Sequence, residues 1–336
     1  METDLPSDLL AGLERVMQGV SRSALAQRAA AISQAYRAGG SSASVIRSND
    51  DALAYALARL PATFAAVTAV LAALRDAAPD FAPRTVLDVG AGPGTASWAA
   101  VASFPDLTAI QLVDENEHLR RLALDLLSFC TTLVLRAAAY RQGAARQLPD
   151  TVTPADLAIA SYLVGEVPGD QLGDIADALW SRVAGVLIVI EPGTPAGFER
   201  IRMLRAHLIG QGGHVVCPCP HDLACPLAGN DWCHFSQRLN RSRDHRQVKG
   251  VSLSFEDEKF SYVVLSRHRP ARPAGDRVLS VPRVSKGQIA TKLCTPQGLV
   301  TDIAPRRDRD AYKARRSWRW GDAVSRSAQT SSQVDE

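Results

Sequence analysis

Four of the six cysteines of this chain fall within seventeen residues, in the stretch CPCPHDLACPLAGNDWC. They are Cys217, Cys219, Cys225 and Cys233. Cysteines at this density form disulfides, hold a metal ion or an iron–sulfur cluster, or serve as reactive thiols. Their spacing contains no C-x₂₋₄-C pair of the kind that zinc sites favour, whereas iron–sulfur clusters tolerate irregular spacing. The residues favour a cluster, with zinc (which His221 and His234 keep open) and inert thiols as alternatives.

A second chemical motif is the glycine-rich turn in VLDVGAGPGT, residues 86–95. Glycines let the backbone approach a ligand closely, and the following helix offers unpaired N–H groups at its N-terminus. The D-x-G-x-G-x-G spacing resembles motif I of S-adenosylmethionine-dependent methyltransferases, in which Asp88 would lie near the ligand's ammonium group. The motif residues are Asp88, Gly90, Gly92 and Gly94. Asp114 ends the next strand about twenty residues on, where an acid accepts hydrogen bonds from ribose hydroxyls. The alternatives are a ligand-free turn capped by Asp88 and, with poorer glycine spacing, nicotinamide binding.

The catalytic motif of such enzymes normally follows the fourth strand, and here that position reads SYLVGE, residues 161–166. The Asn/Asp-Pro-Pro-aromatic signature of amino methyltransferases is missing from this stretch. Tyr162 could stack on a ligand, and Glu166 could act as a base. A strand end with a pocket-lining tyrosine explains the same residues. The sequence therefore favours ligand binding and leaves catalysis open.

The elements that must position these motifs alternate between strands and helices from about residue 84. Helices are expected around 96–103, 116–130 and 170–184, between most of the apolar runs. The predicted strands are 85–89, 109–114, 132–137, 156–161 and 185–191. Such alternation builds a parallel sheet that helices cover on both faces. Residues 252–267 predict two closing strands around a charged turn.

The first 80 residues predict helices, with a loop at 39–44 and a kink or new helix start at Pro61. Hydrophobic residues make up 46% of the chain and charged residues 22%, as in ordinary globular proteins. The acidic N-terminus lacks a secretory signal, and Leu60–Leu74 falls short of the roughly 20 residues that span a bilayer. We therefore expect a cytoplasmic protein without a membrane partner. Thiols stay reduced there, which favours ligand cysteines over disulfides.

Positive charge gathers toward the C-terminus, where residues 267–326 hold fifteen Lys or Arg against five Asp or Glu. Tyr312, Trp318 and Trp320 lie among these charges, and a shorter basic run follows the cysteine motif at 238–249. Lys and Arg pair with phosphates, and interleaved aromatic rings stack on unpaired bases. A solvated charged face is the alternative. The pattern alone leaves RNA binding and a solvated face open, and we expect no DNA.

Several segments point to a known family. They are YALARLPATFAAV, CPHDLACPL, DWCHFSQR, FEDEKFSYVVLSR, LCTPQG and YKARRSWRWGD. Together they resemble the methyltransferase-like proteins of the mitochondrial small ribosomal subunit and their bacterial relatives, which are ribosome assembly proteins. The resemblance extends from about residue 5 to residue 323.

The resemblance implies a 4Fe–4S cluster held by four cysteines. Three come from the C-x₅-C-x₇-C run, and the fourth comes from LCTPQG. Matched by motif, the ligands are Cys219, Cys225, Cys233 and Cys294. Cys217 then lies outside the pattern, and Cys130 is a core thiol. The implied partners are the small ribosomal subunit and its rRNA.

The expected fold is α/β, a class I methyltransferase Rossmann-like domain with a cysteine-rich iron–sulfur insertion and a basic C-terminal extension. The expected parts are helices at 1–80, the methyltransferase-like domain at 81–267 with its insertion at 214–247, the extension at 268–323 and a disordered tail at 324–336. Two functions follow. The protein either methylates small-subunit rRNA with S-adenosylmethionine or assists subunit assembly without catalysis.

Overall fold

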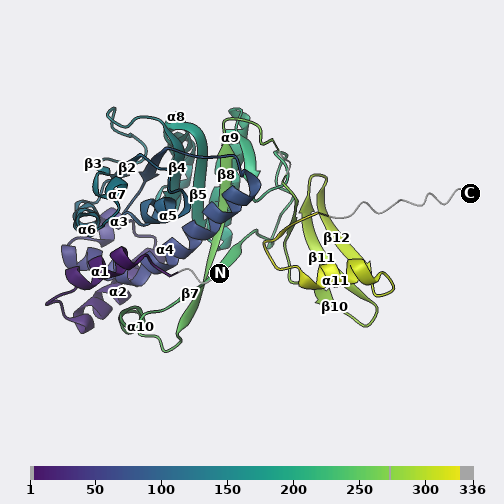
Figure 1. Ribbon diagram of the computed structural model, residues 1–336, viewed down its shortest axis with the longest axis horizontal. Coiled ribbons are helices and arrows are strands. Elements are labelled where there is room, and N and C mark those ends of the chain that lie inside the picture. The colour runs from purple at the N-terminus through teal and green to yellow at the C-terminus, as the bar shows by residue number, and fades with distance from the viewer. Residues whose placement is uncertain (1–3, 272–273, 326–336) are drawn as a thin grey trace, which may run out of the picture.

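Helices from the N-terminal region pack against one face of a central sheet (Figure 1). The computed structural model describes residues 4–271 and 274–325. The first helices are α1 (Ser7–Val16), α2 (Arg22–Arg37), α3 (Ser42–Val45) and α4 (Asn49–Ala77). Pro61 lies inside α4, so it does not begin a new helix. α3 also occupies part of the segment that the sequence predicted as a loop.

The central sheet is mixed, and its strands follow the order β3-β2-β1-β4-β5-β8-β6. The first five are parallel, and β8 runs antiparallel to β5, β6 and β7. The strands are β1 (Thr85–Val89), β2 (Ala109–Asp114), β3 (Ala139–Gln142), β4 (Ala155–Ser161), β5 (Val183–Pro192), β6 (His214–Cys217), β7 (Phe235–Asn240) and β8 (Phe255–Ser266). This doubly wound order confirms the predicted class I methyltransferase fold. Its topological switch point lies between β1 and β4, where ligands bind in such folds.

Helices cover both faces of this sheet, because each strand buries apolar side chains in both directions. Ile188 and Ile190 of β5 face the layer that contains α4 and α5, whereas Leu187 and Val189 face the layer of α8 and α9. The remaining helices are α5 (Thr95–Ser103), α6 (Glu117–Ser128), α7 (Leu133–Arg136), α8 (Leu172–Ser181), α9 (Pro195–Gly210) and α10 (Arg243–Lys249). Two short 3₁₀ turns, Val164–Glu166 and Gly169–Gln171, follow β4.

α4 is long and apolar enough, by length and composition, to cross a membrane. A buried core helix has the same properties, and 61% of its most apolar window is buried inside the protein. Fifteen of its residues are buried, among them Leu60, Leu71 and Leu74. Its interior position accounts for its apolar composition.

Two strand predictions were wrong. Residues 132–137 form helix α7 instead of a strand, with Leu135 buried and Leu133 exposed, and β3 begins later, at Ala139. The run is too short for its periodicity to distinguish helix from strand. Residues 252–267 form one strand rather than two, because the charges of EDEK lie on β8 itself. There Asp257 and Glu256 stand opposite Arg238 and Leu239 of β7.

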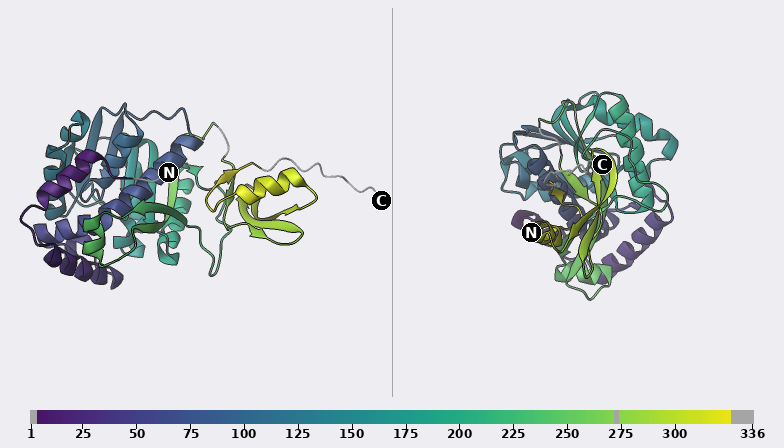
Figure 2. Two further views of the ribbon diagram at one scale, coloured as in Figure 1. Left: turned by 60° about the horizontal axis from the view of Figure 1, so that its bottom comes forward. Right: turned by 90° about the vertical axis from the view of Figure 1, so that its right-hand side faces the viewer.

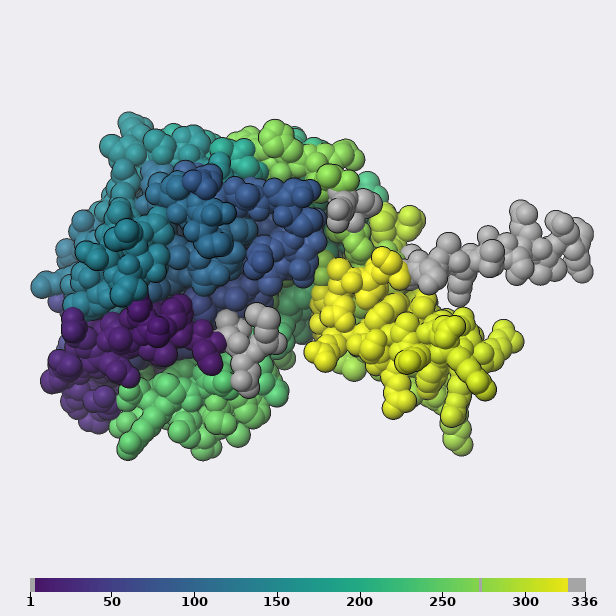
Figure 3. Space-filling model, viewed as in Figure 1, coloured from purple at the N-terminus to yellow at the C-terminus, as the bar shows by residue number. Residues whose placement is uncertain are grey.

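Residues beyond the central sheet, which the sequence predicted only as a basic extension, form a second, smaller sheet (Figure 2). Its strands are β9 (Asp276–Val278), β10 (Arg283–Val284), β11 (Gln288–Thr295), β12 (Gly298–Pro305) and β13 (Ala323–Val324), and helix α11 (Arg309–Ser317) packs on it. Inside this lobe Arg315 pairs with Asp302 at 2.9 Å, and both side chains are buried. The lobe stands beside the main body in Figure 3. Of the tail predicted as disordered, residues 326–336 lie outside the described residues.

Candidate functional site

The glycine turn after β1 adopts the conformation that its sequence predicts. Gly90, Gly92 and Gly94 have φ angles of 66°, 52° and 80°, in the left-handed region that glycine enters without steric cost. A Cβ on Gly90 would come within 2.7 Å of Leu163 Cδ1. The N–H groups of Gly90 and Ala91 both bond to the carbonyl of Val113, at 2.8 and 3.1 Å. The turn therefore lies tightly between the ends of β2 and β4.

Asp88 lies beneath this turn and is fully buried. Its Oδ2 accepts hydrogen bonds from the Ser97 N–H at 3.0 Å and from the Ser97 hydroxyl at 2.9 Å. Within the described residues, its Oδ1 is buried and has no hydrogen-bond partner. Burial raises the pKa of Asp88 to about 7, although Ser97 opposes the rise. An unpartnered carboxylate oxygen at this place suits a cationic donor such as a ligand ammonium group.

Asp114 ends β2 and holds the turn from the other side. Its two oxygens accept backbone N–H groups of Gly92 and Asn116, each at 2.8 Å. Burial raises the pKa of Asp114, and these bonds oppose the rise. An ionised carboxylate has about four acceptor sites, so Asp114 keeps capacity for ribose hydroxyls.

The segment around α3 closes over this edge of the sheet. Asn116 donates from its side chain to the carbonyls of Ser42 and Ile46, at 3.2 and 3.0 Å. Ser42 in turn donates its N–H to Glu166 Oε2 at 2.7 Å. Residues 42–46 thus connect the end of β2 to the turn after β4. Glu166 is partly buried, and burial raises its pKa. One oxygen of this proposed base is therefore already engaged within the protein.

Tyr162, the other catalytic candidate, is also engaged. Its hydroxyl donates to Glu258 Oε1 at 2.8 Å, and the same oxygen accepts from Arg59 Nη2 at 3.0 Å. The Arg59 guanidinium lies 5.4 Å from the Tyr162 ring centre. Tyr162 has a φ of 57°, a strained value for a residue with a side chain. These contacts join α4, β4 and β8, and they give Tyr162 a structural role next to the switch point.

The second candidate site is a cavity between the cysteine-rich segment, α9 and the C-terminal sheet. Phe198, Leu227 and Leu279 form part of its apolar wall. Its cysteines are Cys219, Cys225, Cys233 and Cys294. The first three come from the C-x₅-C-x₇-C run, and Cys294 comes from β11 of the other sheet. The structure thus brings together the four cysteines that the motif match selected.

The thiols of this cavity are close enough to affect one another's ionisation. Burial raises the pKa of Cys294 to about 12, with further contributions from Cys219 and Cys225. The pKa of Cys233 is also raised, by burial first and then by the other three cysteines. All six cysteines of the chain lie among the described residues, and none forms a disulfide. Mutual repulsion between thiolates disfavours ionisation unless a cationic group binds, which is the role of a metal centre.

No single-ion site is formed, because within residues 4–271 and 274–325 no group of three or more His, Cys, Asp or Glu is placed to hold one metal ion. A 4Fe–4S cluster binds each thiolate at a different iron, so its ligands stand farther apart than those of a single ion. Four cysteines around one cavity fit a cluster in this respect. His221 Nε2 lies 3.7 Å from Cys294 Sγ, which also makes it a neighbour of any bound group.

Cys217 lies outside the lining of this cavity. It is fully buried at the end of β6, where it pairs with Val264 of β8. Burial raises its pKa to about 12, and the charge of Arg277 and a hydrogen bond with Tyr262 oppose the rise. Its surroundings are those of a core thiol.

Contacts around the cavity attach the C-terminal sheet to the cysteine-rich segment. Arg277 of β9 donates to the Pro218 carbonyl at 2.9 Å, and Lys292 of β11 pairs with Asp231. Trp320 packs on His234 with ring centres 4.5 Å apart. The C-terminal lobe therefore contacts the main body at several points, and Cys294 lies at one of them.

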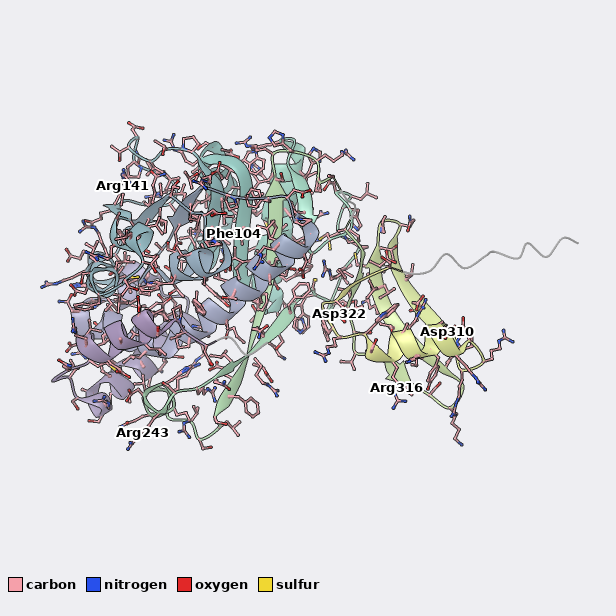
Figure 4. The ribbon with its side chains drawn as sticks, in the orientation of Figure 1. Phe104, Arg141, Arg243, Asp310, Arg316 and Asp322 are labelled. Carbon is pink, nitrogen blue, oxygen red and sulfur yellow. The ribbon has the colours of Figure 1, made fainter. Side chains whose placement is uncertain are left out.

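The two basic segments differ in how much charge remains unpaired. In the first, Arg238 pairs with Asp257, and Arg241 and Lys249 both pair with Glu256. Arg243 of that segment is exposed, as are Arg309, Lys313, Arg316 and Arg319 in the C-terminal lobe. Figure 4 shows Arg316 on the lobe, far from Arg243 on α10. The C-terminal lobe is therefore the stronger candidate surface for phosphates.

Comparison with known proteins identifies the family. A family model described as mitochondrial small ribosomal subunit Rsm22 matches residues 49–325. The chain belongs to this family. The resemblance seen in the sequence is thereby confirmed, and the matched region includes both candidate sites.

Two Rsm22 relatives show the extent of the similarity. The chain is 29% identical over 293 residues to the Homo sapiens ribosome assembly protein METTL17, mitochondrial, covering 81% of this chain and 62% of that protein. It is 28% identical over 246 residues to the Schizosaccharomyces pombe Rsm22-cox11 tandem protein 2, mitochondrial, covering 64% and 32%. The chain thus spans less than two thirds of the length of these relatives.

A solved magnesium protoporphyrin IX methyltransferase from Synechocystis PCC 6803 overlaps 62% of this chain and 80% of its own, at 13% identity and a TM-score of 0.40. The fold assignment here rests on the strand order. The predicted cytoplasmic location is contradicted, because the family and both of these relatives are mitochondrial. The prediction rested on the missing secretory signal, which does not distinguish the cytoplasm from the mitochondrial interior.

Sequence reasoning missed several polar residues that complete the two sites. Ser97 and Asn116 are buried beside the glycine turn, and Arg205 and Arg277 are buried beside the cysteines. Ser97 stands out as a polar residue in the apolar helix TASWAAVAS. Arg205 of α9 contacts the loop at His221, more than ten residues later in the chain. The sequence alone does not reveal this contact.

Proposed function

We propose that this chain is an S-adenosylmethionine-binding, iron–sulfur protein that acts in assembly of the small ribosomal subunit by binding its rRNA. The observation that carries the proposal is the meeting of Cys219, Cys225, Cys233 and Cys294 in one cavity. Membership of the Rsm22 family supports the link to the small subunit.

The methyl donor would lie across the switch point, against the glycine turn. Asp88 would face its ammonium group through the unpartnered Oδ1, and Asp114 would accept from its ribose. The left-handed glycines leave the backbone open to the ligand. When bound, the donor supplies an electrophilic methyl group, and the protein residues orient it.

The cluster would be held by the four cysteines, whose thiolates it stabilises in a buried site. Since Cys294 belongs to β11 and the other three to the segment before β7, a cluster would fasten the C-terminal lobe to the main body. The exposed cations of α11 would then be presented to rRNA in a fixed orientation. In this account the cluster is structural.

Methylation of small-subunit rRNA is the second candidate function, and the glycine turn with Asp88 and Asp114 supports donor binding under both functions. The contacts of Tyr162 with Glu258 and of Glu166 with Ser42 favour assembly without catalysis, because both groups are bonded within the protein. Both functions include binding of S-adenosylmethionine, and only methylation includes transfer of its methyl group to rRNA.

The test is methyl transfer from labelled S-adenosylmethionine to immature small subunits, with Asp88→Ala as the control. Retained subunit association without labelled rRNA is the expected result for the assembly factor. Label in rRNA that disappears in the control establishes the enzyme instead. The proposal is contradicted when neither the wild-type protein nor the Asp88→Ala variant associates with immature subunits.

A further inference from the structure

Two buried arginines line the cysteine cavity. Arg205 lies on α9 and is 4% exposed, and Arg277 lies on β9 and is 7% exposed. Both line the same cavity as the four cysteines. A buried guanidinium is costly unless a counter-charge or a full set of acceptors compensates it. The presence of two such groups at one cavity therefore requires an explanation.

The acceptors of these arginines are neutral. Arg277 donates to the carbonyls of Pro218 and Gly321, at 2.9 and 2.7 Å. Arg205 donates from Nη2 to the carbonyl of His221 at 2.6 Å. Among the described residues, Arg205 Nε is buried without a hydrogen-bond partner. Arg205 is also one of the groups that lower the pKa of Asp222, but that carboxylate is already bonded to His214 and to the Val215 N–H. Positive charge is therefore left for something inside the cavity to balance.

The cysteines are the groups that these charges act on. Arg205 and Arg277 line the same cavity as Cys219, Cys225, Cys233 and Cys294, so a group bound by these thiolates would lie beside both guanidinium groups. In a 4Fe–4S cluster with four thiolates, the four negative charges exceed the +2 charge of the oxidised core. The bound unit is anionic, and one-electron reduction of the core to +1 makes it more so.

A third arginine of the cavity provides an internal comparison. Arg202 lies one turn before Arg205 on α9 and also lines the cavity. Its guanidinium forms two hydrogen bonds with Glu199, at 2.9 and 2.7 Å, and its side chain is 42% exposed. Its charge is therefore paired with Glu199 and screened by solvent, so it should act on the cavity less than the two buried guanidinium groups do.

We propose that Arg205 and Arg277 are the counter-charges of the cluster and hold its reduction potential above the value it would have without them. This inference rests on the proposed 4Fe–4S site. Charge and hydrogen bonds around the sulfurs are established determinants of cluster potentials. Because guanidinium groups do not titrate in proteins, the effect is present at every physiological pH.

The experiment compares Arg205→Gln and Arg205→Lys with Arg202→Gln in anaerobically purified full-length protein. Iron and acid-labile sulfide are measured first, and circular dichroism checks the fold. The cluster is then titrated with dithionite in the presence of redox mediators. Arg277→Gln and Arg277→Lys are treated as a second pair, since Arg277 also holds two backbone carbonyls.

We expect Arg205→Gln to keep iron and sulfide while the reduced-to-oxidised ratio at a fixed potential falls at least tenfold, which is about 59 mV for one electron. Arg205→Lys and Arg202→Gln should remain near the wild-type ratio. Loss of the cluster in the Gln variant with retention in the Lys variant, both folded, also supports the proposal. An unchanged potential in Arg205→Gln, or equal cluster loss in both Arg205 variants, overturns it. A wild-type protein without iron and sulfide instead refutes the cluster itself.

Discussion

The glycine turn and the cysteine cavity are two candidate ligand sites in one chain, and they are built in opposite ways. The glycine turn is assembled from the ends of adjacent parallel strands, and hydrogen bonds from Gly92 to Asp114 and from Ser97 to Asp88 hold it together. The cysteine cavity is assembled from α9, an irregular segment and a strand of a separate sheet.

The difference concerns what each site needs in order to exist. Hydrogen bonds from its own backbone N–H groups hold the glycine turn without a ligand, although among the described residues Asp88 Oδ1 beneath it has no partner. The cysteine cavity gathers one buried and three partly buried cysteines with two arginines that donate to carbonyl groups, an arrangement whose charges balance when an anionic cluster is bound. Burial raises the pKa of Cys233 and of Cys294. We therefore expect the first site to tolerate loss of its ligand and the second to lose structure with it.

The largest effect should come from Cys294→Ser. Removing the ligand that β11 supplies should abolish the cluster absorbance and most of the iron and sulfide, and should release the C-terminal sheet from the main body. Iron analysis together with hydrogen exchange over residues 274–325 measures both. Cys217→Ser is the matched control and should keep the cluster, since Cys217 lies outside the cavity. Full iron and sulfide in Cys294→Ser contradicts the ligand assignment.

The next effect concerns the glycine turn, where Gly90→Ala is compared with Gly92→Ala. An alanine at 90 combines a left-handed conformation with a 2.7 Å approach to Leu163, so we expect a loss of about 3 kcal/mol of unfolding free energy. An alanine at 92 meets only Leu119, at 3.8 Å, and should cost about 1 kcal/mol. Urea unfolding measures both. Equal losses would show that the turn is not packed against Leu163.

A smaller effect is expected from the pH dependence of methyl-donor binding. The pKa of Asp88 is raised to about 7, so the carboxylate that would face a cationic ligand forms only as the pH rises through that value. Affinity for S-adenosylmethionine should increase between about pH 6 and 8, the range that spans this pKa. Asp88→Asn should weaken binding about tenfold at pH 8 and remove the pH dependence. Calorimetry at several pH values tests this, and a flat wild-type profile would exclude Asp88 as the ammonium partner.

The same raised pKa has a consequence for the unliganded protein. Native Asp88 binds its proton more tightly than the unfolded chain does, since an unfolded Asp titrates near pH 3.9. Its contribution to stability should therefore decline as the pH rises from about 4 to about 7. Asp88→Asn removes this contribution. The difference between the wild-type and variant unfolding free energies across this pH range therefore isolates Asp88 from the other carboxylates.

The smallest effect should come from single cations of the basic surfaces. Arg316→Gln should reduce the slope of log affinity for small-subunit rRNA against log salt concentration by about 0.7 to 0.9. Arg238→Gln should change it less, because Arg238 is already paired with Asp257. Filter binding across a salt series distinguishes the two. A larger change for Arg238 would place the RNA surface on the main body.

The sequence predicted the parallel strands and the glycine turn because their signals are local. Strands 85–89 and 109–114 match β1 and β2, and the turn needs glycine wherever φ is positive. The C-terminal sheet was missed, although Ile289, Thr291 and Leu293 of β11 alternate inward. The many charges of that region concealed the alternation.

The cavity was predictable in part. The motif match selected Cys294 and set Cys217 aside, although spacing alone would have selected the four cysteines of residues 217–233. The arginines could not be foreseen, since α9 and β9 are brought to the cavity by packing between sheets. Cross-strand ion pairs likewise explain why EDEK lies within one strand rather than in a turn.

The most direct test of this account is an anaerobic ultraviolet–visible spectrum of the purified protein, combined with iron, sulfide and zinc analysis. A protein that binds the 4Fe–4S cluster should show a broad visible absorbance that dithionite bleaches, with equal amounts of iron and sulfide. Stoichiometric zinc without sulfide, in a protein purified without exposure to oxygen, would contradict it.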